Sequence, residues 1–337
     1  HHVKNPIEVR KIQMAGKSSL AVTIPKRWAE VLGISAGNPV YLEFRGYEVA
    51  ILPALMVHEV EVQRIIEVKP NETSDSVIRR VISAFIKGAQ IIRVKFLNGT
   101  NRELIDEVTR EISVRVPIVE TISHGNGEIK VTVLSPTSSM PIKSFISRMS
   151  NVVSGMFKDA LSLIKMNPEE RLSIARDIMD RDYDVDRNYM LIHRLINMAV
   201  NGVINIRSIE IDDRSELLSC LLVSKSLERS GDHSWRVAQW MLEVGAVSVD
   251  VADTILKLGD EVSNLHKSAV LAFLSKDVDK AQEVLDMRNE VTNARVKVNN
   301  LLKLHGISGP LNLVIESIGR LAAYAYDIAE ITLDTYL

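Results

Sequence analysis

Six long helical patterns occupy residues 138–337, and they constrain the fold more than any other feature of the 337-residue chain. Within each pattern, apolar residues recur every three or four positions, as they do on one face of a helix. Long helices joined by short links form antiparallel bundles. The patterns begin near Pro141, Asn167, Asp212, Ser248, Asp277 and Pro310.

Two stretches of this helical region are repeated. Residues 175–180 (ARDIMD) correspond to residues 281–286 (AQEVLD), and residues 227–231 (LERSG) correspond to residues 315–319 (IESIG). Self-similarity of this kind indicates that one structural unit occurs twice. The sequence therefore predicts an all-α body made of two tandem three-helix bundles, at residues 138–245 and 246–337.

The third helical pattern contains a glycine, Gly231, in the stretch 227–233 (LERSGDH). Glycine in a helix interior costs about 1 kcal/mol relative to alanine, so it needs a reason such as the close approach of another helix. Glu228 and Asp232 are four residues apart and project from one face. Asp182 and Asp186 have the same spacing on the preceding helix.

These two acidic faces lie on neighbouring antiparallel helices, and converging carboxylates need a partner of opposite charge. Carboxylate oxygens suit Fe, Mn, Mg or Ca, and Zn less well, so we predict a metal site. Two alternatives stay open, namely a solvated acidic face or a salt-bridge network with arginines such as Arg181 or Arg229. His233 lies about 100° around the helix from Asp232, so it either leans toward the acidic face or faces solvent.

The second repeat departs from this pattern. Three of its four equivalent positions are Arg288, Thr292 and Arg320, and only Glu316 remains acidic. Arginines in these places would abolish a metal site and could form internal ion pairs instead. The sequence therefore predicts at most one metal site per chain.

Residues 57–135 predict a small α/β sandwich with the element order βαβαββ. Strands are expected at 57–68, 91–96, 117–123 and 129–134, and helices at 73–87 and 101–113. We find no phosphate-binding loop, metal-ligand spacing or nucleophile–base pair in this segment. The segment is therefore expected to be a structural spacer or a sensor.

The head of the chain, residues 3–56, predicts four short strands and a helix at 26–32 that follows Pro25 and ends at Gly33. Such a short segment cannot bury much core alone, and a dimer that shares strands would solve this. Residues 1–56 carry a net charge of +3, whereas residues 136–337 carry −5. This asymmetry suggests that the head meets an anion and that the body holds cations.

The head resembles the AbrB/SpoVT swapped-hairpin DNA-binding domain. The match is carried by residues 16–28 (GKSSLAVTIPKRW), 32–34 (LGI) and 37–40 (GNPV). The resemblance implies an interlaced homodimer that presents basic side chains to DNA phosphates, with an affinity that falls steeply with salt. The candidate DNA-binding residues are Arg10, Lys11, Lys17, Lys26 and Arg27. The alternative is that the head survives only as a dimerisation clasp.

Residues 138–337 resemble the PhoU family of phosphate-signalling regulators. Residues 227–233 match the family's Glu-Arg-Ile-Gly-Asp-His/Arg signature, and residues 182–186 (DYDVD) match its Asp-x-x-Val-Asp motif. An AbrB-like head on such a body resembles the archaeal branch of that family. Acidic pairs of this kind hold metal clusters in the family. The resemblance therefore implies metal ligands at Asp182, Asp186, Glu228 and Asp232.

These observations predict a multi-domain α+β regulator, not an enzyme. The first hypothesis is a dimeric DNA-binding regulator of phosphate uptake with a metal-binding body. The second is an adaptor for a phosphate transporter or a signalling protein, with the head as a dimer clasp. The third is a carboxylate-bridged metalloenzyme, although no Glu-x-x-His pair accompanies the acidic faces. No apolar run reaches the ~18–20 residues that span a bilayer, and the single cysteine, Cys220, suits a reducing cytoplasm.

Overall fold

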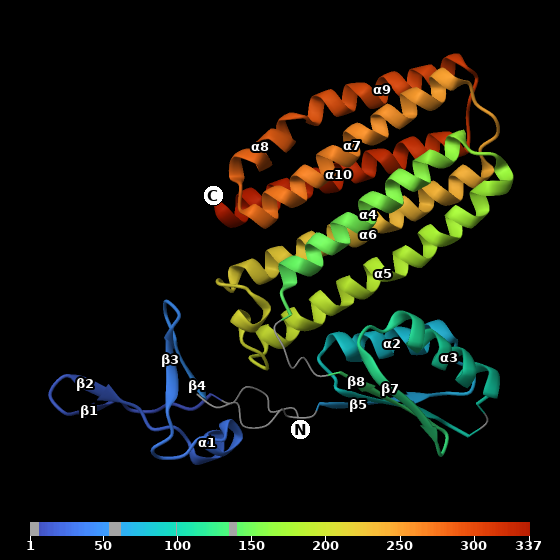
Figure 1. The fold of residues 1–337 in the computed structure, drawn as a ribbon. Helices are drawn as coiled ribbons and strands as arrows, with labels where there is room; N and C mark the ends of the chain where they lie inside the picture. Colours follow the sequence, from blue (N-terminus) through green and yellow to red (C-terminus); the bar gives the residue numbers. More distant parts are fainter. Residues whose placement is uncertain (1–6, 54–61, 99, 135–139) are drawn as a thin grey trace. The chain divides into compact units, whose positions relative to one another are not determined.

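The computed structural model describes residues 7–53, 62–98, 100–134 and 140–337. The chain divides into two compact units, residues 1–61 and residues 62–337. The first unit contains the head, and the second contains the α/β domain (residues 62–134) and the helical body (residues 140–337) (Figure 1). Within the described residues, no helix combines the length and the apolarity that crossing a bilayer needs.

The head consists of two β-hairpins and one short helix. The strands β1 and β2 pair antiparallel, as do β3 and β4, and the two hairpins are separate sheets. The elements are β1 (Gln13–Ala15), β2 (Ser19–Ala21), α1 (Lys26–Leu32), β3 (Val40–Phe44) and β4 (Val49–Pro53). The four predicted strands and the predicted helix are confirmed. The first two strands, expected at residues 9–14 and 20–24, are shorter than predicted, because only residues 13–15 and 19–21 pair with each other.

The α/β domain is a four-stranded sheet with the strand order β5-β6-β8-β7. Its first two strands are parallel and are connected through a helix, whereas the other pairs are antiparallel. The elements are β5 (Gln63–Val68), α2 (Ser74–Ile86), β6 (Ile91–Phe96), α3 (Arg102–Arg115), β7 (Val119–Gly125) and β8 (Glu128–Val133). The predicted order βαβαββ is confirmed. Residues 57–61 of the first predicted strand lie outside the described residues.

The helical body contains all six predicted long helices, but the fifth is broken in two. The helices are α4 (Ile142–Ser162), α5 (Pro168–Val200), α6 (Ser215–Glu243), α7 (Val249–Ser275), α8 (Val278–Asp286), α9 (Arg288–Leu304) and α10 (Pro310–Tyr336). The prediction of one continuous helix from Asp277 to Gly306 is therefore wrong. Met287, between α8 and α9, has a ψ of −8°, which interrupts the helical hydrogen-bond ladder.

The helices form two bundles that share one core. The first bundle is α4, α5 and α6, and the second is α7, α8, α9 and α10. α6 packs along α10, and α4 packs along α7, so the bundles lie side by side (Figure 1). The buried apolar residues of both bundles belong to one continuous cluster. The two bundles are therefore packed together through one apolar core.

Two arginines of α5 hold the α/β domain. Arg194, only 1% exposed, donates from Nη1 to the carbonyl oxygens of Phe85 at 2.6 Å and Ala89 at 2.9 Å. Arg187 donates to the carbonyl oxygen of Val114 at 2.7 Å. The carbonyls of Phe85 and Val114 belong to the last turns of α2 and α3, where helices attract cations. The α/β domain is thus fixed to the same helix that carries Asp182 and Asp186.

A buried histidine makes the stability of the body depend on pH. His266 of α7 is 2% exposed, and its Nε2 lies 2.9 Å from the hydroxyl of Ser230 on α6. Burial lowers the pKa of His266 to about 4. As the pH falls below about 6.5, His266 is therefore protonated in the unfolded chain before it is protonated in the folded protein. The contribution of His266 to stability is complete above that pH and is lost toward pH 4, by up to about 3 kcal/mol.

We expect His266→Gln to reduce the fall in unfolding free energy between pH 7 and about pH 4.5, because the substituted side chain takes up no proton in the unfolded chain. Urea unfolding at the two pH values measures this difference. Exposed His124 of the α/β domain supplies the control, since His124→Gln should leave the fall unchanged. An equal fall in the wild type and His266→Gln would contradict the prediction.

Candidate metal site between α5 and α6

Gly231 brings α5 and α6 close together. It is buried, and a Cβ atom at this position would lie 3.0 Å from Oδ1 of Asp182 and 3.2 Å from Cγ1 of Val185. These separations are shorter than ordinary van der Waals contact. The close approach of another helix, which the sequence offered as the reason for this glycine, is confirmed.

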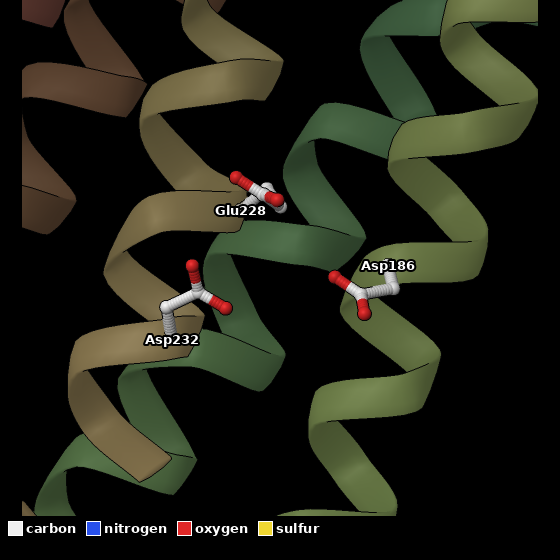
Figure 2. Close-up of side chains that lie close together, drawn as sticks. All are labelled: Asp186, Glu228 and Asp232. Atoms are coloured by element: carbon white, nitrogen blue, oxygen red, sulfur yellow. The ribbon is translucent and has the colours of Figure 1, made fainter. Parts of the chain in front are cut away.

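Three of the four predicted metal ligands converge at this contact. One carboxylate oxygen from each of Asp186, Glu228 and Asp232 lies within 4.8 Å of the others. Figure 2 shows Asp186 reaching from α5 toward Glu228 and Asp232 on α6. Asp182 stands outside this group of three, and its Oδ1 is buried without a hydrogen-bond partner. We call these four residues the acidic cluster.

Burial and mutual repulsion disfavour the charged forms of the acidic cluster. Burial, with the like charges of the other members, raises the pKa of Asp182 and the pKa of Asp186 to about 7. The pKa of Asp232 is also raised, chiefly by burial and then by Glu228. These three aspartates make no hydrogen bond or ion pair with any described residue. The three aspartates therefore lack a directly paired cation, although Arg236, Lys225 and Arg229 oppose the rise in the pKa of Asp232 from a distance.

The arginines that could have compensated the cluster do little there. Arg181 pairs with Asp159 and Asp177, each at 2.7 Å, away from the cluster. Arg229 approaches Glu228 only to 3.8 Å. Of the arginine salt-bridge network that was the alternative, only the long contact between Arg229 and Glu228 is present among the described residues.

Lys225 is the residue that the sequence reasoning missed. Its Nζ lies 2.7 Å from Oε2 of Glu228 and 4.8 Å from the ring centroid of Tyr189. The signal was present in the sequence, because residues three apart on a helix are neighbours. Lys225 and Arg115 of α3 also oppose the rise in the pKa of Asp186. Only Glu228 among the four carboxylates is ion-paired with a described residue, so the cluster keeps an excess of negative charge.

The donor set fits a hard or borderline cation. Three converging carboxylates and the unpartnered Oδ1 of Asp182 offer oxygen ligands, which Mg, Ca, Mn and Fe accept. A cation bound there would favour the ionised carboxylates and relieve their repulsion. Asp186, Glu228 and Asp232 would hold it, with Asp182 beside them.

His233 faces a different helix. Its Nδ1 lies 3.3 Å from the hydroxyl oxygen of Ser317 on α10, and its ring centroid is 6.0 Å from that of Tyr324. Burial, helped by nearby arginines, lowers the pKa of His233 to about 4. Of the two directions left open by the sequence, His233 takes neither, since it packs against α10.

The candidate DNA-binding residues all belong to the head. They are Arg10, Lys11, Lys17, Lys26 and Arg27. All five are exposed, but Arg10 and Arg27 both pair with Glu8. The structure thus brings two of the five together around one glutamate, and Lys11 and Lys17 make no ion pair within the described residues.

Family models match both ends of this architecture. A model of the PhoU domain matches residues 146–241 and 255–332, and a model of the antidote-toxin recognition protein MazE, a bacterial antitoxin, matches residues 13–54. A phosphate-specific transport system accessory protein PhoU homolog from Clostridium acetobutylicum is 22% identical over 162 residues. That similarity covers 48% of this chain and 71% of the relative.

Two solved structures are also similar. PhoU from Pseudomonas aeruginosa has a TM-score of 0.46 at 20% identity, with 57% of this chain and 93% of that chain covered. The phosphate transport system regulatory protein PhoU from Streptococcus pneumoniae has a TM-score of 0.47 at 16% identity, with 57% and 91% covered. The PhoU model extends over more than half of the sequence. The chain therefore belongs to the PhoU domain family and has a MazE/AbrB-like domain at its head.

Proposed function

We propose that this protein is a cytoplasmic regulator of phosphate uptake, with a metal-binding helical body and a head that dimerises and binds DNA. The convergence of Asp186, Glu228 and Asp232 within 4.8 Å carries the proposal for the body. The accessory role that the Clostridium acetobutylicum relative has in phosphate-specific transport supports the assignment to phosphate uptake. A phosphate transporter or its signalling protein is the partner that this role implies.

The exposed apolar surface of the head supports the homodimer. Pro25 is the only buried residue among the described residues of the head. Met14, Leu20, Leu42 and Phe44 are between 65% and 77% exposed. Large apolar side chains exposed on both hairpins are typical of an interaction surface, and the AbrB/SpoVT resemblance points to a second copy of the head as its partner.

The basic side chains of the head support DNA binding. Lys11, Lys17 and Lys26 are exposed, and a dimer would present each of them twice. Phosphate neutralisation by lysines gives an affinity that depends on salt and not on sequence. The pairing of Arg10 and Arg27 with Glu8 instead favours the second candidate, an adaptor whose head is only a dimer clasp.

We expect the wild-type protein, purified without a histidine tag, to retain close to one equivalent of a transition or alkaline-earth metal, measured by mass spectrometry. Asp186→Asn with Asp232→Asn should lose it, because two of three converging ligands are removed. The matched control is Asp180→Asn with Glu243→Gln, which changes exposed acids on the same two helices. Equal, low metal in all three proteins would make the cluster an uncompensated acidic surface.

We expect binding to duplex DNA to weaken steeply as salt rises. Lys17→Ala with Lys26→Ala should lower the slope of log affinity against log salt by up to about 4 in a dimer, about 1 for each phosphate contact removed. Fluorescence anisotropy at several salt concentrations measures this slope.

The control for the DNA measurement is Lys257→Ala with Lys303→Ala, which removes exposed lysines of the body and should leave the slope unchanged. Sedimentation of each variant shows whether the dimer persists. A dimer that binds no duplex DNA at low salt would exclude the DNA-binding role and favour the adaptor.

A redox or hydrolytic turnover that Asp186→Ala abolishes would instead favour the metalloenzyme.

A further inference from the structure

A cavity of about 330 Å³ lies between α9 and α10 in the second bundle. Two arginines, Arg288 and Arg295, line it together with the ring of Tyr326. Asp327 is the one carboxylate in the lining, and the other lining residues are apolar apart from Thr292. The cavity is therefore a partly cationic hollow, and neither the acidic cluster nor the head contributes to it.

The cavity occupies the repeat equivalent of the acidic cluster. Arg288 takes the place of Asp182, and Gly319 takes the place of Gly231. A Cβ atom at Gly319 would overlap Nη1 of Arg295, just as a Cβ atom at Gly231 would crowd the carboxylate of Asp182. Each glycine thus leaves room for a charged side chain from the neighbouring helix. The charge is negative in the first bundle and positive in the second.

Two of the donors in this cavity have no partner among the described residues. Arg295 makes no hydrogen bond or ion pair there. Tyr326 is 8% exposed, and its hydroxyl is buried without a hydrogen-bond partner. A buried hydroxyl without a partner is costly, and a phenol hydroxyl can donate or accept, whereas a guanidinium can only donate. The missing group must therefore accept hydrogen bonds and is best negatively charged.

Arg288 is available only in part. Its Nη2 pairs with Oε1 of Glu330 at 3.0 Å, which realises the internal ion pair expected for this repeat. Its guanidinium also lies 4.9 Å from the ring centroid of Tyr326. A guanidinium has five N–H donors, so one ion pair leaves others for a ligand. The hydroxyl of Thr292 already donates to the carbonyl oxygen of Arg288 at 2.8 Å and is not counted as a donor.

We propose that this cavity binds a phosphate-class oxyanion, either inorganic phosphate or the phosphoryl group of a small metabolite. Arginine presents a planar fork of donors that matches the oxygens of phosphate. Donors from Arg288, Arg295 and Tyr326 surround one space, which suits the several oxygens of a phosphate better than the two of a carboxylate. Asp327 repels an anion, and Glu330 already offsets part of the charge of Arg288. The guanidinium of Arg295, which has no such partner, therefore supplies most of the attraction.

The inference is independent of the proposed metal site and of the proposed DNA binding. The acidic cluster lies on α5 and α6, whereas this cavity is lined by α9 and α10. The cavity is larger than one phosphate ion requires, so water or the organic part of a phosphoryl compound fits beside the anion.

The test is calorimetric titration of the full-length protein with inorganic phosphate and, separately, with adenosine monophosphate. A chelator is present throughout, so that phosphate cannot bind through a metal at the acidic cluster. We expect saturable binding that Arg295→Gln weakens at least about tenfold, the size expected for a charge-assisted hydrogen bond. Gly319→Ala should also weaken it, because the added methyl group displaces the guanidinium of Arg295.

The matched control is Arg320→Gln, which removes the same charge from an exposed position on α10 outside the cavity and should leave the affinity within about twofold. Arg295→Lys keeps the charge but not the fork, and should bind with intermediate affinity. Circular dichroism melting verifies the fold of each variant, and Arg295→Lys serves as the test if Arg295→Gln fails to fold.

Two sources of the anion are distinguished by the two probes. Binding of phosphate identifies the free ion, and binding of adenosine monophosphate alone identifies a phosphoryl group on an organic carrier. Both outcomes support the site if the Arg295 variant loses them. The absence of saturable binding of either probe to the wild type would overturn the proposal. So would an affinity that is unchanged in a folded Arg295 variant.

Discussion

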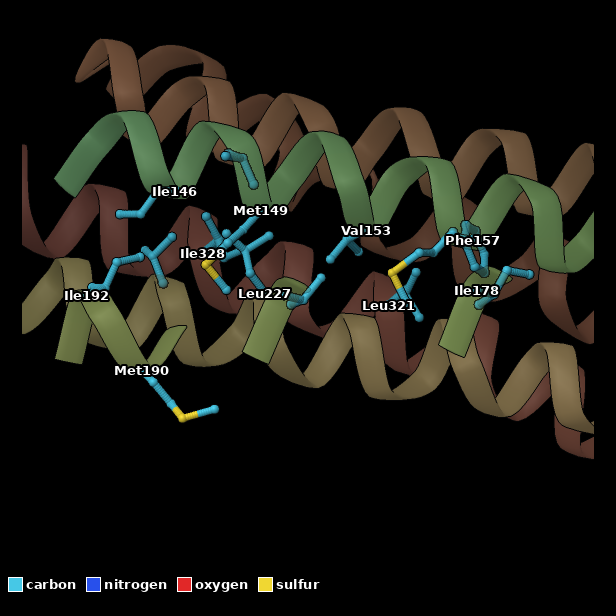
Figure 3. Packing of buried hydrophobic residues seen from close by; sticks show 14 of the residues in the cluster. Ile146, Met149, Val153, Phe157, Ile178, Met190, Ile192, Leu227, Leu321 and Ile328 are labelled. Atoms are coloured by element: carbon cyan, nitrogen blue, oxygen red, sulfur yellow. The ribbon is translucent and has the colours of Figure 1, made fainter. Parts of the chain in front are cut away.

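The contact of α5 with α6 at Gly231 determines the chemistry of the body, because it holds like charges together. Two ionised carboxylates about 5 Å apart repel by roughly 3 kcal/mol at the effective dielectric constant of a partly buried site. This repulsion is offset by the apolar core in which Leu227 of α6 and Ile178 of α5 take part (Figure 3). Apolar packing thus holds α5 and α6 together against the repulsion between the carboxylates. A cation bound between the carboxylates would replace that repulsion with attraction.

The same helix connects this site to the α/β domain. Asp186 belongs to the acidic cluster, and the next residue, Arg187, donates to the carbonyl of Val114 at the end of α3. Arg115, one residue further along the chain, contributes to the potential at Asp186. A member of the acidic cluster and a residue that holds the α/β domain therefore lie within one turn of α5.

Much of this arrangement is predictable from the sequence, because helix periodicity and four-residue spacing are local properties. They place Glu228 and Asp232 on one face, and a glycine between them implies a close neighbour. Other features depend on contacts between distant residues. Spacing alone does not show that Asp182 stands outside the group of three, or that Arg181 turns away toward Asp159. Side-chain direction at these positions is decided by the packing of neighbouring helices.

The two bundles share one helix arrangement but place side chains of opposite charge beside the equivalent glycine. The glycine is present in both bundles, at Gly231 and Gly319. In each bundle the missing Cβ atom leaves room for a side chain of the neighbouring helix, whatever its charge. The charge differs, because the repeat replaces an aspartate by Arg288 and lays Arg295 across the second glycine. α6 and α10 pack along each other, and His233 meets Ser317 between them. Ions of opposite sign, bound one to each bundle, would therefore act on a single apolar core.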